Sequence, residues 1–402
     1  MNTPGNPPPV LSLIVPTRER REYLGYALQT CVRQPVQDME ILVLDNASGD
    51  NSLEVVDAIG DPRIAYHRSD RRLSMRDNFE RGCDIARGEI ICFIGDDDGI
   101  LPDAIPQVLK LFRDNGVDAL SADRAHYAWP DLLSGRRNTA LIPRHRGFEV
   151  LDSRVQLRSL LTDDNYYKLP CVYHGFVRRS VVKEIQQKQG RMFLSSQVDM
   201  FSAIALSMEA VRYVFSRTPF IVNGGSQRSN GAAHFGGGGQ EEKALWKKED
   251  DIGFLPGFAD SATVGALIIE SALRYVAANG CRLADVLDRE DILSALSNEA
   301  HARLCQDRPI DATRSMYHAA GVEMPLKFRQ NRRSAARAVQ LGKAFLKSCP
   351  VDMDGCGVHE VDAAAQRIGG LLANRRTHLW NSPMAQLSTA LRMYARRPAE
   401  VS

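Results

Sequence analysis

The amino-acid sequence predicts an α/β fold in which a mainly parallel sheet is flanked by helices and followed by a helical C-terminal extension. From Val10 onward, short β-rich runs alternate with helical stretches, which is the pattern of βα units in a sheet covered on both faces. Beyond Asp250 the pattern becomes helical. The strand-like runs are 10–17, 40–46, 63–69, 89–95 and 117–128, and the helical stretches between them are 21–34, 51–60, 75–88 and 101–116.

The middle of the chain is less regular. Residues 131–147 are expected to form a loop or hairpin, and helices are expected near 153–162, near 180–189 and after Ser196, which would act as a cap. Residues 224–239 contain seven glycines in 16 positions, a density typical of either a plain linker or an active-site lid.

Composition and charge exclude several classes of protein. The chain of 402 residues is 44% hydrophobic and 25% charged, as in folded globular proteins, and its net charge of +2 predicts no nucleic-acid partner. Its eight cysteines include no CxxC pair, which favours a reducing, cytoplasmic environment. We expect neither a signal peptide nor a transmembrane helix.

Three consecutive aspartates follow the strand-like run that ends near residue 95, in the stretch "FIGDDDGILP". Because side chains two apart point to the same side of a strand, Asp96 and Asp98 can converge on one ion, while Asp97 points elsewhere, for example to a sugar hydroxyl. Carboxylates suit Mg²⁺ or Mn²⁺, and Mg²⁺ fills its remaining positions with substrate phosphates. The alternative is a solvated acidic turn that caps a helix starting near Pro102.

Polar residues also follow two other strand-like runs. Thr17 and Asp45 end the first and second runs, and ligands of parallel sheets bind outside the carboxyl ends of the strands. We therefore expect Thr17, Asp45 and the aspartate run to lie at one edge of the sheet.

Three motifs in this order, "LSLIVPTRER", "EILVLDNASGDNS" and "ARGEIICFIGDDDGILPDAI", resemble the nucleotide-sugar-binding region of family 2 glycosyltransferases, which have the Rossmann-like GT-A fold. The resemblance covers about residues 10–125. It implies that Pro16 and Thr17 lie against the nucleotide, that Asp45 binds the base, and that the aspartate run is a DXD-type motif.

The resemblance also ranks the carboxylates and adds nucleotide contacts. Asp98 is expected as the first metal ligand and Asp96 as the second, with Asp97 as a ribose or metal contact. A stretch that often contacts the nucleotide contains Arg72, Arg76 and Asn78, although both arginines could equally be surface charges of a helix.

The general base implied by the resemblance is Asp199, in "SSQVDMFS". Val198 stands where these enzymes often carry an acidic residue, and the QxxRW element of processive synthases is absent, which favours transfer of a single sugar. Asp199 could instead complete a capping arrangement with Ser196. Asp163 and Asp164 are the reserve candidates for the base.

His234, in the glycine-rich stretch, is a candidate metal or diphosphate ligand on loop closure, or simply an exposed histidine. Arg228 and Ser229 in the same stretch could bind phosphate.

The expected organisation has three parts. Residues 1–9 form a flexible N-terminus, 10–240 form the GT-A domain, and 250–402 form the helical C-terminal region. Within the domain, 10–128 is the nucleotide-sugar-binding half and 129–240 the acceptor half.

The resemblance implies a metal-dependent enzyme that uses Mn²⁺ or Mg²⁺ to transfer a sugar from a nucleotide-diphosphate donor, a UDP-sugar first of all, to an acceptor hydroxyl. The reaction would be inverting and non-processive, with glycan or lipid-linked acceptors in envelope polysaccharide synthesis. The alternative is a catalytically inactive sugar-nucleotide-binding protein. The basic segment 329–347 would form either a solvated helix face or a peripheral contact with the inner face of the membrane. The oligomeric state stays open.

Overall fold

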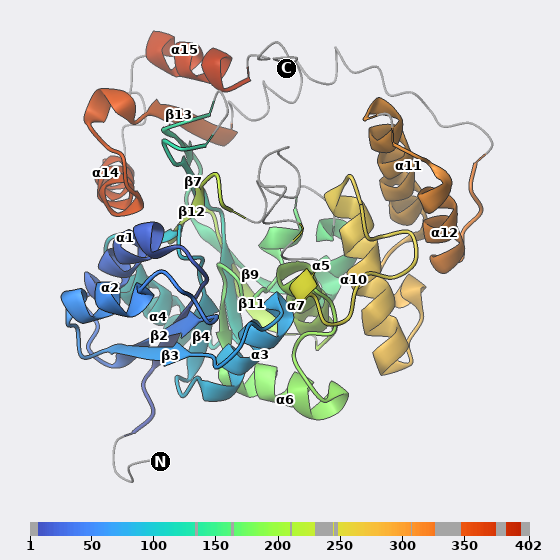
Figure 1. The fold of residues 1–402 in the computed structure, drawn as a ribbon, viewed down its shortest axis with the longest axis horizontal. Helices are drawn as coiled ribbons and strands as arrows, with labels where there is room; N and C mark the ends of the chain where they lie inside the picture. The colour runs from blue at the N-terminus through green and yellow to red at the C-terminus, as the bar shows by residue number, and fades with distance from the viewer. Residues whose placement is uncertain are drawn as a thin grey trace.

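The computed structural model describes residues 7–132, 136–161, 165–209, 211–229, 244, 248–306, 308–325, 347–374 and 383–394. Within these residues the predicted α/β fold is confirmed: a mainly parallel sheet lies between layers of helices, and further helices follow it in the chain (Figure 1). The described helices include none that is both long and apolar enough to cross a membrane.

An eight-stranded sheet forms the centre of the molecule, in the order β3-β2-β1-β4-β10-β6-β11-β9. Its first four strands are parallel, with β1 paired to β2 from Leu11 opposite Met39 to Thr17 opposite Asp45. β10 is antiparallel to both of its neighbours, β11 is parallel to β6, and β9 is antiparallel to β11. The bounds are β1 Leu11–Thr17, β2 Met39–Asp45, β3 Ile64–Arg68, β4 Ile90–Phe93, β6 Ala119–Ala122, β9 Phe148–Asp152, β10 Phe176–Arg178 and β11 Arg212–Ser216.

Side chains that alternate along β1 supply the cores on the two faces of this sheet. Leu13 packs in the core shared with α1 (Arg21–Val32), α2 (Ser52–Ile59) and α4 (Ala104–Asn115). Ile14 packs in the core on the other face, which α3 (Met75–Ile85), α6 (Arg179–Gln189) and α7 (Val198–Met208) share. This alternation is the two-residue period of a strand buried on both faces. α5 (Ser153–Leu160) and the short η1 (Tyr166–Lys168) lie beside α7.

A second sheet of five strands lies next to the first, in the order β13-β8-β7-β12-β5. The expected loop or hairpin near 131–147 contributes β8, which pairs with β7 and with β13 from the far end of the chain. β5 pairs with β12 directly after the aspartate run, so this sheet fixes the backbone on the C-terminal side of the run. The bounds are β5 Gly99–Ile100, β7 Ala125–Ala128, β8 Thr139–Pro143, β12 Ile221–Gly225 and β13 Ser348–Asp352.

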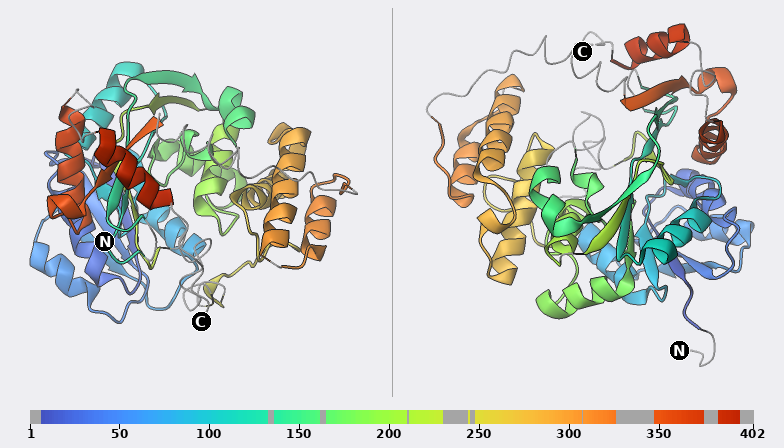
Figure 2. Two further views of the ribbon diagram at one scale, coloured as in Figure 1. Left: turned by 90° about the horizontal axis from the view of Figure 1, so that it is seen from above. Right: turned by 180° about the vertical axis from the view of Figure 1, so that it is seen from behind.

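The chain beyond residue 250 packs in two separate places. α10 (Val264–Asn279) packs on α7, and α11 (Arg289–Cys305) and α12 (Asp311–Ala319) continue that layer away from the sheet (Figure 2). The last described segments, α14 (Val361–Ala373) and α15 (Pro383–Tyr394), lie on the opposite side of the molecule, beside α1 and β13 (Figure 1). The predicted C-terminal helices are therefore present, and β13 adds a strand that the sequence pattern did not predict. The short η2 (Leu283–Asp285) and η3 (Asp354–Cys356) complete these segments.

Two adjacent glycines of α14 have different surroundings, so substitutions at these positions test whether the helix packs on Pro102. A Cβ on Gly369 would lie 2.8 Å from Cδ of Pro102, next to the aspartate run, whereas a Cβ on Gly370 would meet no atom within 4 Å. We expect Gly369→Ala to lower the free energy of unfolding by about 1–3 kcal/mol through overpacking. Gly370→Ala should leave it unchanged or raise it by about 0.5–1 kcal/mol through helix propensity.

Chemical denaturation of both variants measures this difference. Equal effects of the two substitutions would show that α14 does not pack on Pro102 in solution.

Candidate active site at the ends of β1, β2 and β4

The carboxyl ends of β1 and β4 bring the first predicted site residues together. Thr17, the last residue of β1, donates a hydrogen bond from Oγ1 to Oδ2 of Asp96 over 2.7 Å. All three aspartates of the run are buried, and Asp98 has no exposed surface. A solvated acidic turn is therefore not what the structure shows.

Asp98 accepts hydrogen bonds from four donors. They are the backbone N–H of Gly95 at 2.5 Å and of Gly224 at 2.7 Å, the hydroxyl of Tyr173 at 2.9 Å, and Nε2 of His174 at 2.5 Å. Burial acts to raise the pKa of Asp98, but His174 and the two backbone donors outweigh it and hold this pKa below its usual value. Asp98 is thus an ionised carboxylate whose two oxygens are both engaged.

The loop that carries Tyr173 and His174 is held in a demanding conformation. His174 has a φ of 62°, which is rare for a residue with a side chain, and its ring stacks on Tyr173 with centroids 4.0 Å apart. A Cβ on Gly175 would lie 2.1 Å from the carbonyl oxygen of Cys171, so only glycine fits there. Nδ1 of His174 is buried without a hydrogen bond to the described residues. The hydrogen bonds from Tyr173 and His174 to Asp98 offset the unfavourable energy of this backbone conformation.

Asp96 and Asp97 share a positively charged neighbour, Arg20, which directly precedes α1. Its Nη1 lies 2.6 Å from Oδ1 of Asp96, and its Nη2 lies 3.4 Å from Oδ2 of Asp97. Burial raises the pKa of Asp96 to about 6, although Arg20 opposes this shift. Ser226 and Ser229 also donate hydroxyl hydrogen bonds to Oδ2 of Asp97, at 2.7 and 2.5 Å.

A divalent ion fits this acidic run only if substrate supplies most of its ligands. The described residues form no group of three or more acidic, histidine or cysteine side chains that could hold a metal ion. Oδ1 of Asp97, however, makes no hydrogen bond to the described residues, whereas both oxygens of Asp98 accept hydrogen bonds. One or two carboxylates completed by phosphate oxygens are the usual environment of Mg²⁺.

Asp45, which was predicted to bind the nucleobase, ends β2 next to the end of β1, where Thr17 contacts the aspartate run. Its carboxylate accepts hydrogen bonds from Tyr66 and from the backbone N–H of Ser48, the latter at 2.9 Å. Arg72 lies next to it, donating to the carbonyl oxygen of Asn46 at 2.9 Å and pairing with Glu19. Thr17 and Asp45 are opposite each other in the pairing of β1 with β2, and Arg72 contacts Asn46, the residue after Asp45. The three predicted residues therefore lie near one another.

The other residues that were predicted to contact the nucleotide interact with residues of the protein itself. Arg76 is buried on α3, where it pairs with Asp251 and donates to the carbonyl oxygen of Phe193. Asn78 is buried and donates to the carbonyl oxygen of Leu44 at 3.5 Å. Pro16 lies in β1, one residue before Thr17, and is half-buried.

Asp199 lies in the first turn of α7 and accepts a hydrogen bond from the hydroxyl of Tyr166 at 2.8 Å. The residue before this helix is Gln197, which makes no side-chain capping bond, and Ser196 donates instead to Asp250. The capping arrangement considered for Asp199 is thus not formed. Burial, with Asp199 second, raises the pKa of Tyr166 well above its usual value, so its hydroxyl stays protonated.

Asp199 and the aspartate run contact the same segment of the chain, residues 171–174. The thiol of Cys171, at the start of this loop, donates to the backbone oxygen of Asp199 at 3.4 Å, and the loop ends on Asp98. Among the residues of the glycine-rich stretch that the structure describes, Ser229 contacts Asp97, and Arg228 pairs with Glu22. His234, Asp163 and Asp164, and the basic segment 329–346, lie outside the described residues.

Sequence reasoning did not identify several residues of this site. Of these residues, Arg20 was the easiest to identify from the sequence, because it stands three positions after Thr17 in "PTRER". Tyr173 and His174 gave no signal, since they lie in an irregular stretch about 75 residues from the run they contact, and Tyr166, which contacts Asp199, lies in the same stretch.

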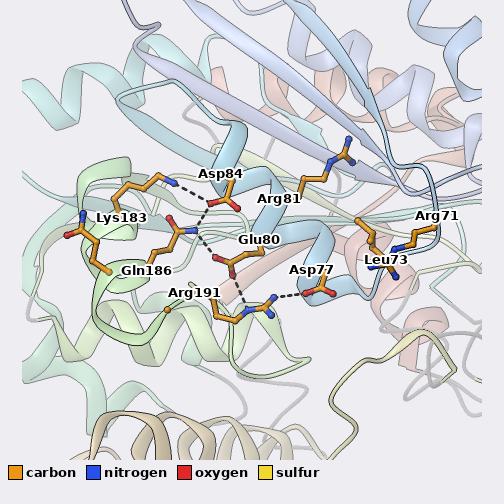
Figure 3. A pocket seen from close by; sticks show the side chains of 11 residues that line it. Arg71, Leu73, Asp77, Glu80, Arg81, Asp84, Lys183, Gln186 and Arg191 are labelled. Atoms are coloured by element: carbon orange, nitrogen blue, oxygen red, sulfur yellow. Dashed lines mark hydrogen bonds and ion pairs between the residues drawn. The ribbon is translucent and has the colours of Figure 1, made fainter. Parts of the chain in front are cut away.

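A hollow of about 750 Å³ lies elsewhere, between α3 and α6 (Figure 3). Its charged side chains neutralise one another: Arg191 lies 2.7 Å from Asp77, and Lys183 lies 3.4 Å from Asp84. Because no residue of the aspartate run lines it, we do not assign the active site to this hollow.

Residues 12–184 match the model of the family described as glycosyl transferase family 2. The GalNAc(5)-diNAcBac-PP-undecaprenol beta-1,3-glucosyltransferase of Campylobacter jejuni is 34% identical over 105 residues, which cover 25% of this chain and 34% of that protein. The abequosyltransferase RfbV of Salmonella typhimurium is 30% identical over 120 residues, covering 29% of this chain and 36% of that protein. The matched part of the chain thus spans about a third of the length of these curated relatives.

Two solved structures are similar at lower identity. One is S. aureus TarS 1-349 in complex with UDP-GlcNAc, with 13% identity, a TM-score of 0.46, and coverage of 80% of this chain and 97% of that one. The other is a mannosyltransferase from Pyrobaculum calidifontis in complex with GDP-Man and Mn²⁺, with 13% identity, a TM-score of 0.45, and coverage of 93% and 88%.

The contrast between Asp98 and Asp97 predicts different effects on stability. Asp98→Asn places an amide among donors that need an acceptor, and we expect it to lower the free energy of unfolding by about 3 kcal/mol. Asp97→Asn removes one of three neighbouring negative charges and should change stability by less than about 1 kcal/mol. Urea denaturation of both variants measures the difference, and equal stability of the two would refute the assignment of a structural role to Asp98.

Proposed function

We propose that the chain is a metal-dependent enzyme that transfers a sugar from a nucleoside-diphosphate donor to an acceptor hydroxyl, because residues 12–184 match the model of glycosyl transferase family 2. The observation that carries the proposal is the buried run of three aspartates at the strand ends, held by Thr17 and Arg20, in which Oδ1 of Asp97 accepts no hydrogen bond from the residues that the structure describes. A UDP-sugar is the first candidate donor. The two curated relatives, named as a glucosyl and an abequosyl transferase, support the reaction class.

Each part of the site has a role in this proposal. Asp45 and Arg72 bind the nucleoside, and Asp96 and Asp97 lie at the diphosphate. We assign the metal contact to Asp97, with Asp96 as its neighbour, in place of the expected order that began with Asp98, because Asp98 already accepts four hydrogen bonds. A bound Mn²⁺ or Mg²⁺ would act as a Lewis acid that neutralises the charge growing on the leaving diphosphate.

In the proposed reaction, the aspartate run binds the diphosphate and Asp199 acts as the general base. The acceptor hydroxyl attacks the anomeric carbon from the side opposite the diphosphate, a new C–O bond forms, and the bond from that carbon to the phosphate oxygen breaks with its electrons. The hydroxyl proton passes to Asp199, and the sugar carbon is inverted. Tyr166 donates to Asp199 and so fixes the orientation of its carboxylate. The product is a single added sugar, on a glycan or lipid-linked acceptor.

Donor binding tests the proposal first. Calorimetric titration of UDP should detect binding in the presence of Mn²⁺ and at least about tenfold weaker binding in EDTA, because a divalent ion held by Asp97 would attract the diphosphate. Asp97→Ala should lose the Mn²⁺-dependent binding. Asp114→Ala, which removes an exposed carboxylate on α4, is the matched control and should bind like the wild type. Binding of UDP, GDP and dTDP that is absent, or unaffected by both Mn²⁺ and Asp97→Ala, would contradict the proposal.

The role of Asp199 predicts a loss of turnover without a loss of donor binding. Asp199→Asn keeps the shape of the side chain but cannot accept the proton, so we expect the release of UDP from a hydrolysable UDP-sugar to slow by about 10²–10⁴-fold. Tyr166→Phe removes only the orienting hydrogen bond and should have a smaller effect.

Nucleotide release is measured with water as acceptor, so the natural acceptor is not needed. Wild-type rates in Asp199→Asn would assign the base to another residue, whereas a wild-type protein that binds UDP-sugars and releases no UDP would be the inactive binding protein.

A further inference from the structure

Arg20 is a positively charged residue that pairs with two carboxylates of the aspartate run. Its guanidinium bridges the two carboxylates, with Nη1 2.6 Å from Asp96 and Nη2 3.4 Å from Asp97, and Nη2 also lies 3.3 Å from Oγ of Ser226. It lies over the ring of Tyr23, 5.6 Å from the centroid, and its side chain is 15% exposed. The guanidinium is thus enclosed by the same two carboxylates that the proposed function assigns to the diphosphate and its ion.

The charges around this guanidinium limit what can bind next to it. Asp98 is held separately by hydrogen bonds from His174 and three other donors, whereas Asp96 and Asp97 both pair with the guanidinium of Arg20. A divalent ion arriving alone at Asp97 would place two further positive charges beside a buried guanidinium. A nucleoside diphosphate arriving alone would meet two carboxylates. Each ligand by itself is therefore opposed by a like charge, and each supplies the opposite charge that the other lacks.

One atom of Arg20 also lacks a partner. Its Nε is buried and makes no hydrogen bond within the part of the chain that the structure describes. A buried donor left without an acceptor is costly, and guanidinium groups commonly bind phosphate through two parallel N–H donors. The side chain therefore has unused capacity to bind an anion such as a phosphate group.

We propose that Arg20 is a built-in counter-cation for Asp96 and Asp97, and that a divalent ion and a nucleoside diphosphate bind at this site only together. The ion takes over the carboxylates that Arg20 bridges, and the diphosphate supplies the anion that Arg20 then contacts. This inference rests on the proposed function for the identity of the second ligand, the nucleoside diphosphate. Its first half, competition between Arg20 and the ion, depends on the described residues alone.

The test is Mn²⁺ binding, followed by the electron paramagnetic resonance signal of the free ion, in the presence and absence of UDP. In the wild type, Mn²⁺ alone should bind weakly, and saturating UDP should tighten its binding by at least about tenfold. Arg20→Gln removes the positive charge beside both carboxylates, so Mn²⁺ alone should bind about tenfold tighter than to the wild type, and the effect of UDP should shrink. Arg20→Lys, which keeps a charge but cannot bridge two carboxylates, should fall between them.

The control is Arg21→Gln, which removes the neighbouring guanidinium without touching the run, since Arg21 contacts Asp50 and Glu54. It should behave like the wild type. Unchanged or weaker binding of Mn²⁺ alone to Arg20→Gln would overturn the proposal. If that variant does not fold, as judged by circular dichroism, the wild type decides: equally tight Mn²⁺ binding with and without UDP would overturn it. Failure of the proposed function would give a different result: UDP would bind under no condition. The comparison of Mn²⁺ binding, without UDP, to the wild type and to Arg20→Gln would still test the competition between Arg20 and the ion.

Discussion

The carboxylate of Asp98 is the interaction on which the rest of this site depends. Its four donors come from three separate parts of the chain: the turn at Gly95 after β4, the Tyr173–His174 loop before β10, and Gly224 in β12. A buried charge with fewer partners would be strongly destabilising, so these segments must meet at Asp98 for the protein to fold. The close approach of Gly224, whose Cβ would lie 1.8 Å from the carbonyl oxygen of Asp97, follows from the same convergence.

This arrangement divides the aspartate run by role. Asp98 faces the interior and joins the two sheets, whereas Asp96 and Asp97 are balanced by groups that can exchange partners: the Thr17 hydroxyl, two serine hydroxyls and one guanidinium. Such contacts are easily replaced by a phosphate or an ion, which a saturated carboxylate does not allow. The run therefore combines one fixed charge with two charges available for binding.

The sequence predicted those features that depend on short-range patterns. The strands β1 to β4 and the meeting of Thr17 with Asp96 follow from alternation and from the geometry of parallel sheets. The pairing of β13 with β8 is different, because it joins segments about 200 residues apart and no local pattern encodes the partner of a strand. The C-terminal region was accordingly predicted as helical only, and its strand was missed.

Some residues of the candidate site could likewise be predicted from local sequence patterns, and others could not. Asp96, Asp97 and Asp98 were identified together, but alternation along a strand ranked Asp98 with Asp96 as the pair facing a ligand. The run begins after β4 has ended, at a turn closed by the bond from Gly95 to Asp98, so the two-residue period no longer applies there. The donors that occupy Asp98, His174 among them, became visible only in three dimensions.

The most direct test of this account is a crystal structure of the protein with UDP and Mn²⁺, with the ion located by its anomalous scattering. The account predicts the ion in contact with Asp97 and the diphosphate, Arg20 turned onto a phosphate oxygen, and Asp98 still bonded to His174. An ion bound to Asp98 with His174 displaced, or a nucleotide bound away from the aspartate run, would contradict it.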